Sequence, residues 1–430
     1  MSGRPAVVMN LFHTGLGIAR SLGERGIPVI GLTAQHGVCG NFTRYAKVLF
    51  TPDSKNEPEE LLRYLIGATE EIPDGSVIFP TRDDDVVFLD RYRKELEARF
   101  VLTIPQEAAV EACLDKWKTY QSALQAGVAV PRSWVAETTE EIARISQGVR
   151  FPCVLKPVAA HEWRKGGNWE LVGGRKAIGI GSAADLIAEY NAIARAGRRV
   201  LIQEMVPGGD DALLIAGCYL DRESHFIAGF NTQKLVQIPE GFGTGCVVRG
   251  TDCPELLDPT IRLLQAIGFS GIAEVEYKRD AVDGTYKLIE INPRPWDQHR
   301  LGNACGVDLP YLAYCEHAGL PLPDVKKKPT GHKWIAEDAF LLGLIQSMYR
   351  FDGRFLPLLR MARGKRIFAI WSWKDPLPFA GYMTTRFIPE FLRAVLKAVW
   401  ARVVRRDAGT VNRRMGRRYD VRLESGKSNG

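Results

Sequence analysis

The stretch Glu290-Ile-Asn292-Pro-Arg294 closes the apolar run at 286–292 and sets how the rest of the chain is interpreted. Alternate side chains of an extended segment share one face, so Glu290, Asn292 and Arg294 are expected to converge at the strand end. Magnesium prefers hard oxygen ligands and arginine binds phosphoryl oxygens, so this trio suits a magnesium-bound phosphate. Taken alone, the stretch also fits a surface ion pair beside a Pro-Arg-Pro turn. The other segments of the chain are needed to distinguish a phosphate site from such an ion pair.

A second acidic strand precedes this one. Residues 271–278 carry Glu274 and Glu276, and a turn at 280–284 leads toward Glu290. A hairpin joining the two strands would place Glu276 beside Glu290 and Asn292, so that two carboxylates share a metal site. Glu274 has the same parity and stays open as a further ligand.

Two upstream segments suit a nucleotide. Phe151–Pro157 is a buried type of strand with Lys156 near its end, and a glycine-dense loop at 160–181 follows it. Bare backbone amides in such a loop approach an anion closely, although ordinary surface loops are also rich in glycine. Residues 201–206 then predict a strand that runs into a sharp turn.

Taken in order, these segments resemble the ATP-grasp superfamily, whose members hold ATP between two α+β lobes and activate a carboxylate as an acyl phosphate. The resemblance covers roughly residues 110 to 320. It implies an α/β and α+β protein with a Rossmann-like pre-grasp domain at 1–110 and an ATP-grasp domain at 111–325. The small lobe would span 111–200 and the large lobe 201–325, followed by a C-terminal extension at 326–430.

The resemblance also implies roles for single residues. The nucleotide-binding residues would be Lys116 and Lys156 on the phosphates, Glu204 at the adenine amino group, Met205 and Val206 at the adenine edge, and Asp211 on the ribose. The metal ligands would be Glu276, Glu290 and Asn292. Arg294 matches the arginine on the transferred phosphate, and Lys234 is expected to join it.

The residues after Arg294 resemble the carboxylate-amine ligase branch and are candidates for substrate contact. Trp296 fits a substrate wall or plain packing, and Asp297 fits an ammonium partner or an ion pair with Arg300. His299 fits either a group that orients the substrate or a structural histidine.

The resemblance implies an enzyme that uses ATP and Mg²⁺, with Mn²⁺ as an alternative. A small-molecule carboxylate would become an acyl phosphate, and an amine would displace phosphate from it. A phosphotransferase on the same nucleotide site and a catalytically silent nucleotide-binding protein stay open as alternatives. The identities of the carboxylate and amine, and the oligomeric state, stay open.

Composition agrees with a multidomain globular protein. The chain has 430 residues, of which 46% are hydrophobic and 25% charged, which excludes a disordered chain and predicts more than one domain. Its eight cysteines include no C-x-x-C pair, and no apolar run approaches a signal sequence or a membrane span. We therefore expect reduced cysteines and a cytoplasmic location.

Basic charge is concentrated in the tail. Residues 401–430 hold nine Arg and Lys against three Asp and Glu, which fits a disordered, solvated tail with no specific partner. Apolar residues also recur at helical spacing over 386–406. Such a helix fits an anionic membrane, on the inner face of which the protein would be peripheral. It fits equally a helix packed on the protein's own core. No aromatic-studded basic strand accompanies the arginines, so nucleic acid is not expected as a partner.

The N-terminal residues predict a β-α-β start, with strands at 6–11 and 28–32 around a helix ending near Leu22. Gly15 and Gly17 sit where a dinucleotide-binding fingerprint would lie, but Arg20 replaces its third glycine. A redox cofactor is therefore not expected. Asp83 to Asp85 are expected to cap a helix after the third strand.

Overall fold

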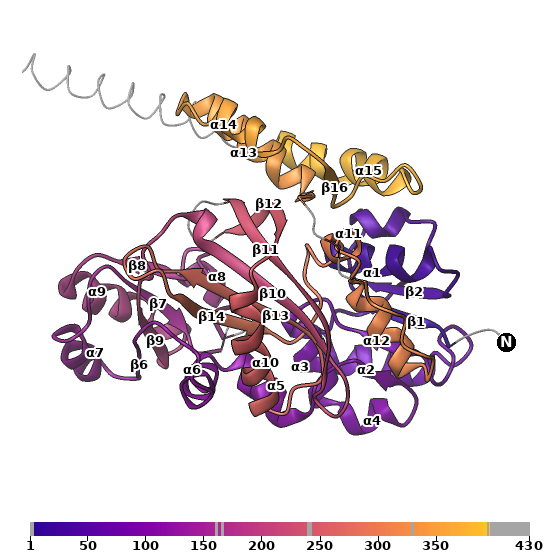
Figure 1. Ribbon diagram of the computed structural model, residues 1–430, viewed down its shortest axis with the longest axis horizontal. Coiled ribbons are helices and arrows are strands. Elements are labelled where there is room, and N and C mark those ends of the chain that lie inside the picture. The colour runs from indigo at the N-terminus through magenta and orange to yellow at the C-terminus, as the bar shows by residue number, and fades with distance from the viewer. Residues whose placement is uncertain are drawn as a thin grey trace, which may run out of the picture.

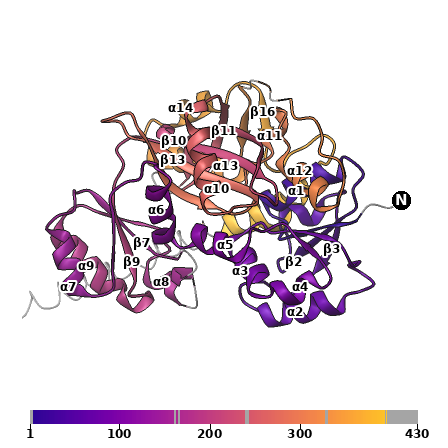
Figure 2. The same cartoon turned by 60° about the horizontal axis from the view of Figure 1, so that its bottom comes forward.

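The protein is described by a computed structural model, which covers residues 4–159, 162–164, 167–238, 243–326, 328, 331–393 and 395. Three sheets follow one another along the described chain (Figure 1). The turned view in Figure 2 places the five-stranded and the four-stranded parts on opposite sides, with the seven-stranded sheet between and above them. This mixed α/β and α+β architecture agrees with the predicted fold class.

The first sheet is parallel, with strand order β3-β2-β1-β4-β5. Its strands are β1 (Ala6–Met9), β2 (Val29–Thr33), β3 (Lys47–Phe50), β4 (Val77–Phe79) and β5 (Val101–Leu102). The helices that connect or follow them are α1 (His13–Gly23), α2 (Pro58–Gly67), α3 (Asp83–Arg91), α4 (Arg93–Glu97) and α5 (Glu107–Leu114). Strands β1, β2 and β4 are buried along their whole length because helices cover both faces of a parallel sheet. The loops after β1 and β4 meet where the strand order reverses, which is where α/β sheets bind ligands.

The second sheet is antiparallel and small, with order β6-β9-β7-β8. It contains β6 (Ser133–Ala136), β7 (Cys153–Pro157), β8 (Ile178–Ile180) and β9 (Val200–Glu204), with α6 (Lys116–Gln125), α7 (Thr139–Ser146), α8 (Asn168–Leu171) and α9 (Ala183–Ile193) around it. Helix α7 begins with a capping box in which Thr138 and Glu141 satisfy each other's backbone N–H groups. The aliphatic residues of α7, α9 and the strands form one core.

The third sheet has seven strands in the order β14-β13-β10-β11-β12-β15-β16. They are β10 (Leu213–Leu220), β11 (Phe226–Ile238), β12 (Thr244–Thr251), β13 (Gly271–Arg279), β14 (Tyr286–Asn292), β15 (Lys333–Ile335) and β16 (Arg366–Phe368). Helices α10 (Leu257–Ala266), α11 (Leu301–Ala304) and α12 (Leu309–His317) accompany it. Alternation along β10 sends Leu214, Ala216 and Cys218 to one core and Ile215 and Tyr219 to another.

The C-terminal segment is joined to the rest of the protein in two ways. Strands β15 and β16 extend the large sheet beyond β12. Helices α13 (Glu337–Arg350), α14 (Phe355–Met361) and α15 (Leu377–Tyr382) form a layer over β12 and α1 (Figure 1). The predicted helix at 386–406 is described only as far as 393 and at 395, and the basic tail lies outside the described residues.

Two further observations concern the cysteines and the lengths of the helices. All eight cysteines are buried and none forms a disulfide. Within the part of the chain that the structure describes, every helix falls short of the length or the hydropathy that a transmembrane span requires.

Arg20, the residue that replaces the third fingerprint glycine, is fully buried. Its Nε donates to Asp375 Oδ2 at 2.9 Å, and its Nη2 donates to the carbonyl oxygens of Ile370 and Asp375. The same Asp375 oxygen accepts from Thr43 Oγ1 at 2.6 Å, and its other oxygen accepts from the Arg44 N–H. This buried ion pair therefore links α1 to the C-terminal segment.

We expect Asp375→Ala to lower the free energy of unfolding by about 3–5 kcal/mol, because it leaves the guanidinium of Arg20 buried without its counter-charge. Lys374→Ala is the matched control, since Lys374 pairs with Glu24 at 3.1 Å but is 71% exposed. That control should cost about 0–1 kcal/mol. Urea denaturation of both variants measures the difference, and equal losses would contradict a structural role for the buried pair.

Candidate active site

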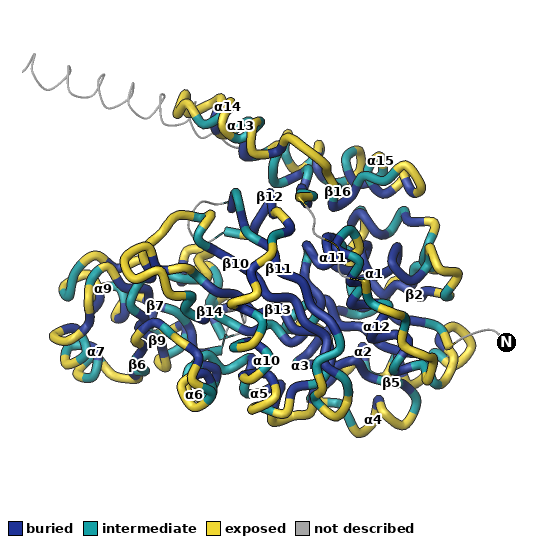
Figure 3. The backbone as a smooth tube through the Cα atoms, viewed as in Figure 1, coloured by how far each residue is buried: buried dark blue, intermediate teal, exposed yellow. Residues whose placement is uncertain are grey.

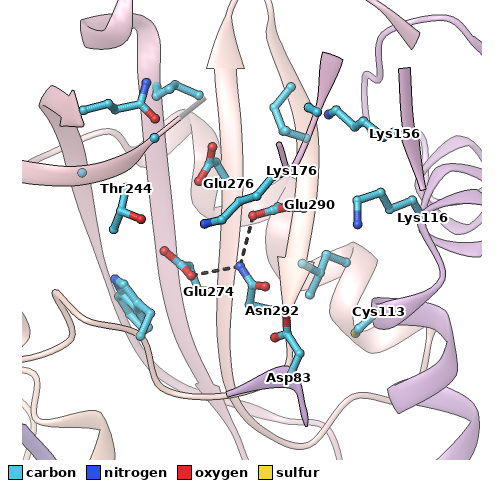
Figure 4. A pocket seen from close by; sticks show the side chains of 18 of the residues that line it. Asp83, Cys113, Lys116, Lys156, Lys176, Thr244, Glu274, Glu276, Glu290 and Asn292 are labelled. Atoms are coloured by element: carbon cyan, nitrogen blue, oxygen red, sulfur yellow. Dashed lines mark hydrogen bonds between the residues drawn. The ribbon is translucent and has the colours of Figure 1, made fainter. Parts of the chain in front are cut away.

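Antiparallel strands β13 and β14 bring the acidic side chains together. Glu276 is paired with Glu290 and Glu274 with Asn292, as the predicted hairpin required. Asn292 Nδ2 donates to Glu274 Oε2 at 3.0 Å and to Glu290 Oε1 at 3.4 Å (Figure 4). Glu274, which the sequence left open, therefore belongs to the cluster.

Three lysines reach the same cluster from other elements. Lys234 on β11 donates from Nζ to Glu276 Oε2 at 2.5 Å, and both Lys234 and Arg294 act electrostatically on Glu274. Lys116 begins α6, whose start Asp115 fixes by accepting from the N–H groups of the first turn. Lys156 lies on β7, and its Nζ donates to Gln203 Oε1 at 3.0 Å.

These cations change the protonation of the cluster. Burial acts to raise the pKa of the Glu290 carboxyl, but the charges of Lys116, Lys156 and Lys234 outweigh it and lower that pKa. Burial lowers the pKa of Lys156 to about 8. Burial also raises the pKa of Glu274 to about 8, because several carboxylates crowd a site that is shielded from water.

A cavity of about 460 Å³ lies over this cluster and extends to the first domain (Figure 4). Its walls include Trp163 and Trp169 from the segment between β7 and β8, and residues 81–84 from the loop after β4 and the start of α3. Twelve of the residues singled out from the sequence line it: Lys116, Lys156, Glu204, Met205, Val206, Lys234, Glu276, Glu290, Asn292, Arg294, Trp296 and Asp297. Asp211 and His299 do not.

Arg294 makes its main contact with the first domain. Its Nε donates to Asp83 Oδ1 at 2.7 Å, and the pair is largely buried. We expected Asp83 to Asp85 to cap a helix, and all three lie in the first turn of α3, where Asp85 accepts from the N–H groups of Thr81 and Arg82. Asp83 also orients Arg294, a role for which the sequence contains no local signal.

At the expected adenine end, Gln203 and Glu204 both line the cavity, but they are neighbours on β9 and their side chains make different contacts. Glu204 accepts from the Arg150 N–H at 3.3 Å and lies 3.7 Å from Arg132 Nη1. Gln203 shares the face of Lys156 because both lie on facing strands at matching parity. The alternation of side chains along β7 and β9, counted from Lys156, would have identified Gln203 as a residue that lines the cavity.

A similar difference holds at the expected ribose end. Asp211 is exposed, whereas Asp210 accepts from Gln237 Nε2 at 2.8 Å. Gln237 and Lys278 line the cavity, and Asp210 opposes the lowering of the Lys278 pKa that burial causes. Asp210 therefore contacts a residue of the cavity wall, and the assignment of Asp211 to the ribose stays a prediction. Lys278 and Lys176 are further lining residues that sequence reasoning missed.

The three candidate substrate residues have different surroundings. Trp296 lines the cavity and also packs on Phe230, with ring centroids 5.6 Å apart. Asp297 accepts from Thr14 Oγ1 at 2.7 Å. His299 is fully buried behind the cavity wall, donates from Nε2 to the Thr14 carbonyl oxygen, and has its pKa lowered to about 4 by burial.

The position of His299 explains Gly17. A Cβ at Gly17 would lie 2.6 Å from His299 Nε2, so only glycine allows the ring to approach α1. His299 therefore packs against α1 beside the loop that carries Asp297, and its role in orienting a substrate stays a prediction.

No protein-family model matches the chain. Over 265 residues it is 23% identical to a D-aspartate ligase of Enterococcus faecium, a match that spans 59% of this chain and 62% of that protein. The match therefore covers less than two thirds of that relative's length.

Solved structures show the fold. A biotin carboxylase–β,γ-ATP complex from Campylobacter jejuni has a TM-score of 0.59 at 18% identity, over 74% of this chain and 72% of that one. N5-carboxyaminoimidazole synthetase from Staphylococcus aureus, complexed with ADP, has a TM-score of 0.57 at 14% identity, over 75% and 79%. The chain has the ATP-grasp fold of these structures, as the order of its motifs predicted.

The residues of the cavity fit a magnesium nucleotide. The carboxylates of Glu276 and Glu290 and the amide oxygen of Asn292 are hard oxygen donors at adjacent strand ends. Bound Mg²⁺ would counter both the burial and the neighbouring carboxylates, which together raise the pKa of Glu274. Lys116, Lys156 and Arg294 supply positive charge along the same cavity for phosphate groups.

Proposed function

We propose that this protein is an ATP-dependent carboxylate–amine ligase. The observation that supports this best is the convergence of Glu276, Glu290 and Asn292 with Lys156 and Arg294 on one cavity. The cavity also opens toward the loops after β1 and β4, where an α/β domain presents substrates. Bound Mg²⁺ would offset phosphate charge in this site.

In the proposed reaction, a substrate carboxylate oxygen attacks the γ-phosphorus of ATP, the bond to the β–γ bridging oxygen breaks, and ADP leaves. Lys156 and Arg294 hold phosphoryl oxygens in line, and Asp83 keeps the Arg294 guanidinium in a fixed orientation. An amine then attacks the acyl carbon, and phosphate departs with the electron pair of the acyl–oxygen bond. Arg294 also lies where it would stabilise the oxyanion of that step.

Water has to be excluded, because an acyl phosphate hydrolyses when exposed. Trp163 and Trp169 in the segment between β7 and β8 line the cavity, and Trp163 is 1% exposed. These rings form an apolar cover over the polar end of the site. We also infer a cytoplasmic location, which the eight buried and unbridged cysteines support.

A crossed screen tests the function. Purified protein with MgATP would be incubated with carboxylic acids and amines, singly and in pairs, and with both enantiomers of aspartate because of the D-aspartate ligase relative. A ligase should form stoichiometric ADP and phosphate, and an amide product, only when both substrates are present. Phosphate transfer to a stable acceptor without an amine would make the protein a phosphotransferase, and the absence of turnover across the screen would overturn the ligase assignment.

The nucleotide end gives a separate prediction. We expect Gln203→Ala and Asp210→Ala to weaken ATP binding about tenfold, the effect of losing one hydrogen bond of about 1.4 kcal/mol. Glu204→Ala and Asp211→Ala are the matched neighbours. Their effects should be smaller, because the Glu204 carboxylate already accepts from the Arg150 N–H and Asp211 is exposed to solvent. Isothermal titration with a non-hydrolysable ATP analogue measures all four. A larger loss for Glu204 and Asp211 would restore the assignment made from the sequence.

A further inference from the structure

The hairpin of helices α13 and α14 has an apolar tip that faces solvent (Figure 3). Its exposed side chains are Phe351 at 93%, Tyr349 at 63%, Leu356 at 61% and Met348 at 58%. A single exposed apolar residue is ordinary, but four on one short hairpin mark an interaction surface. We call residues 348–356 the hairpin tip.

Phe351 is held at the tip against the preference of the backbone. It follows the last residue of α13 with φ of 53°, in the left-handed region, where glycine is the usual residue. A bulky side chain there is strained, and a strain of this kind points to a role outside local folding. The exposed ring gains little packing that would offset the strain.

Basic residues flank the apolar tip in the sequence. Residues 348–366 contain six arginines and lysines against one aspartate, a net charge of +5. Arg350, Arg360, Arg363 and Lys365 are exposed. Two copies of this surface would repel each other, so the charge favours an anionic partner over a second copy of the chain.

The segment after α15 also carries exposed apolar side chains. Ile388, Leu392 and Val395 recur at helical spacing and are 44%, 53% and 41% exposed. Residues 401–430, outside the described part, add a net charge of +6. Exposed aliphatic and aromatic side chains flanked by arginine and lysine are the composition of surfaces that lie in the lipid headgroup region.

We propose that the hairpin tip docks on an anionic phospholipid membrane, with Phe351 and Leu356 in the interfacial region and the flanking basic residues on lipid phosphates. Binding requires no spanning segment. It holds the protein at the surface through a short apolar insertion together with electrostatic attraction, and each term alone is weak. The attraction falls as salt is added because headgroup and side-chain charges are screened.

Co-sedimentation of the full chain tests the proposal, with vesicles of equal parts phosphatidylserine and phosphatidylcholine, and with phosphatidylcholine alone as the neutral control. We expect binding to the anionic vesicles only, and a loss of about tenfold or more in Phe351→Asp, because burial of one aromatic ring drives part of the binding. Val282→Asp is the matched control, since Val282 is 83% exposed on the turn between β13 and β14.

Phe351→Gly separates binding from folding. Glycine relieves the left-handed strain, so the variant should melt at the same or a higher temperature and still bind vesicles less. A full chain that ignores anionic vesicles overturns the proposal. The proposal is also overturned if Phe351→Asp binds vesicles as well as the wild-type chain does. If a chain cut after residue 395 then fails to bind, the tail and not the hairpin tip is the membrane anchor. A change of oligomeric state in Phe351→Asp, measured by sedimentation velocity, would instead make the tip a contact between copies and would also overturn it.

Discussion

Glu290→Gln is expected to reduce ATP turnover by about 10²–10³-fold, the usual effect of removing one preorganised electrostatic group from an active site. Glu290 faces Glu276 across β13 and β14, and it is the carboxylate on which the charges of Lys116, Lys156 and Lys234 act together. The amide keeps the shape of the side chain but removes the charge that a magnesium ion requires. Turnover should be measured at saturating magnesium with the substrate pair that the crossed screen identifies.

Folding has to be measured beside activity, because the substitution leaves buried lysines with less compensation. The thermal midpoint with and without MgATP provides that measurement, and we expect the stabilisation by MgATP to shrink in the variant. Glu255→Gln serves as the control, since Glu255 is exposed and distant from the cavity lining. Near-normal turnover by a folded Glu290→Gln would remove this carboxylate from the metal site.

Arg294→Ala is expected to lower turnover by about 10³-fold, at the lower end of the range for arginines that stabilise phosphoryl transfer. The same substitution also breaks the ion pair with Asp83. A structural role and a catalytic role therefore predict the same result for this single variant, and a second substitution is needed to separate them.

A double-mutant cycle with Asp83→Ala makes the distinction. If Arg294 acts on the reacting phosphate, the double variant should be as inactive as Arg294→Ala, and Asp83→Ala alone should lose less because the guanidinium is still present. If the pair only joins the two domains, removing both partners should recover activity relative to Arg294→Ala. Recovery of that kind would assign Arg294 to packing and not to chemistry.

The sequence predicted the parts of the site that depend on local periodicity. Glu276 pairs with Glu290, and Glu274 pairs with Asn292, as a hairpin of two neighbouring strands predicts. A β-bulge at Ile289 interrupts the regular register between the turn and these pairs, and the sequence did not predict it. The β-α-β start was also predictable, since its apolar runs and helix have the ordinary lengths. The order of motifs then predicted the ATP-grasp fold.

Features that depend on tertiary packing could not be predicted from local sequence patterns. Asp83 and Arg294 are 211 positions apart in the sequence, and no sequence pattern near either residue predicts that they pair. Glu204 was assigned to the adenine end by the family resemblance, which gave no role to Gln203, although Gln203 also lines the cavity on the face of Lys156. His299 was left open between a substrate contact and a structural role, and its packing against Gly17 depends on the fold of α1, which the residues near His299 do not indicate.

The buried pair of Arg20 and Asp375 has a consequence for how the chain folds during synthesis. The two residues are 355 positions apart, so the ribosome has made most of the protein before the counter-charge of Arg20 emerges. Domains generally fold from the N-terminus as they are produced. Here the first domain would have to keep α1 open to water until then, because closing it would bury an uncompensated cation. Its final compaction is therefore tied to the arrival of the C-terminal segment, and a nascent chain stalled before residue 375 should expose α1 to protease although every strand of the first sheet has already been synthesised.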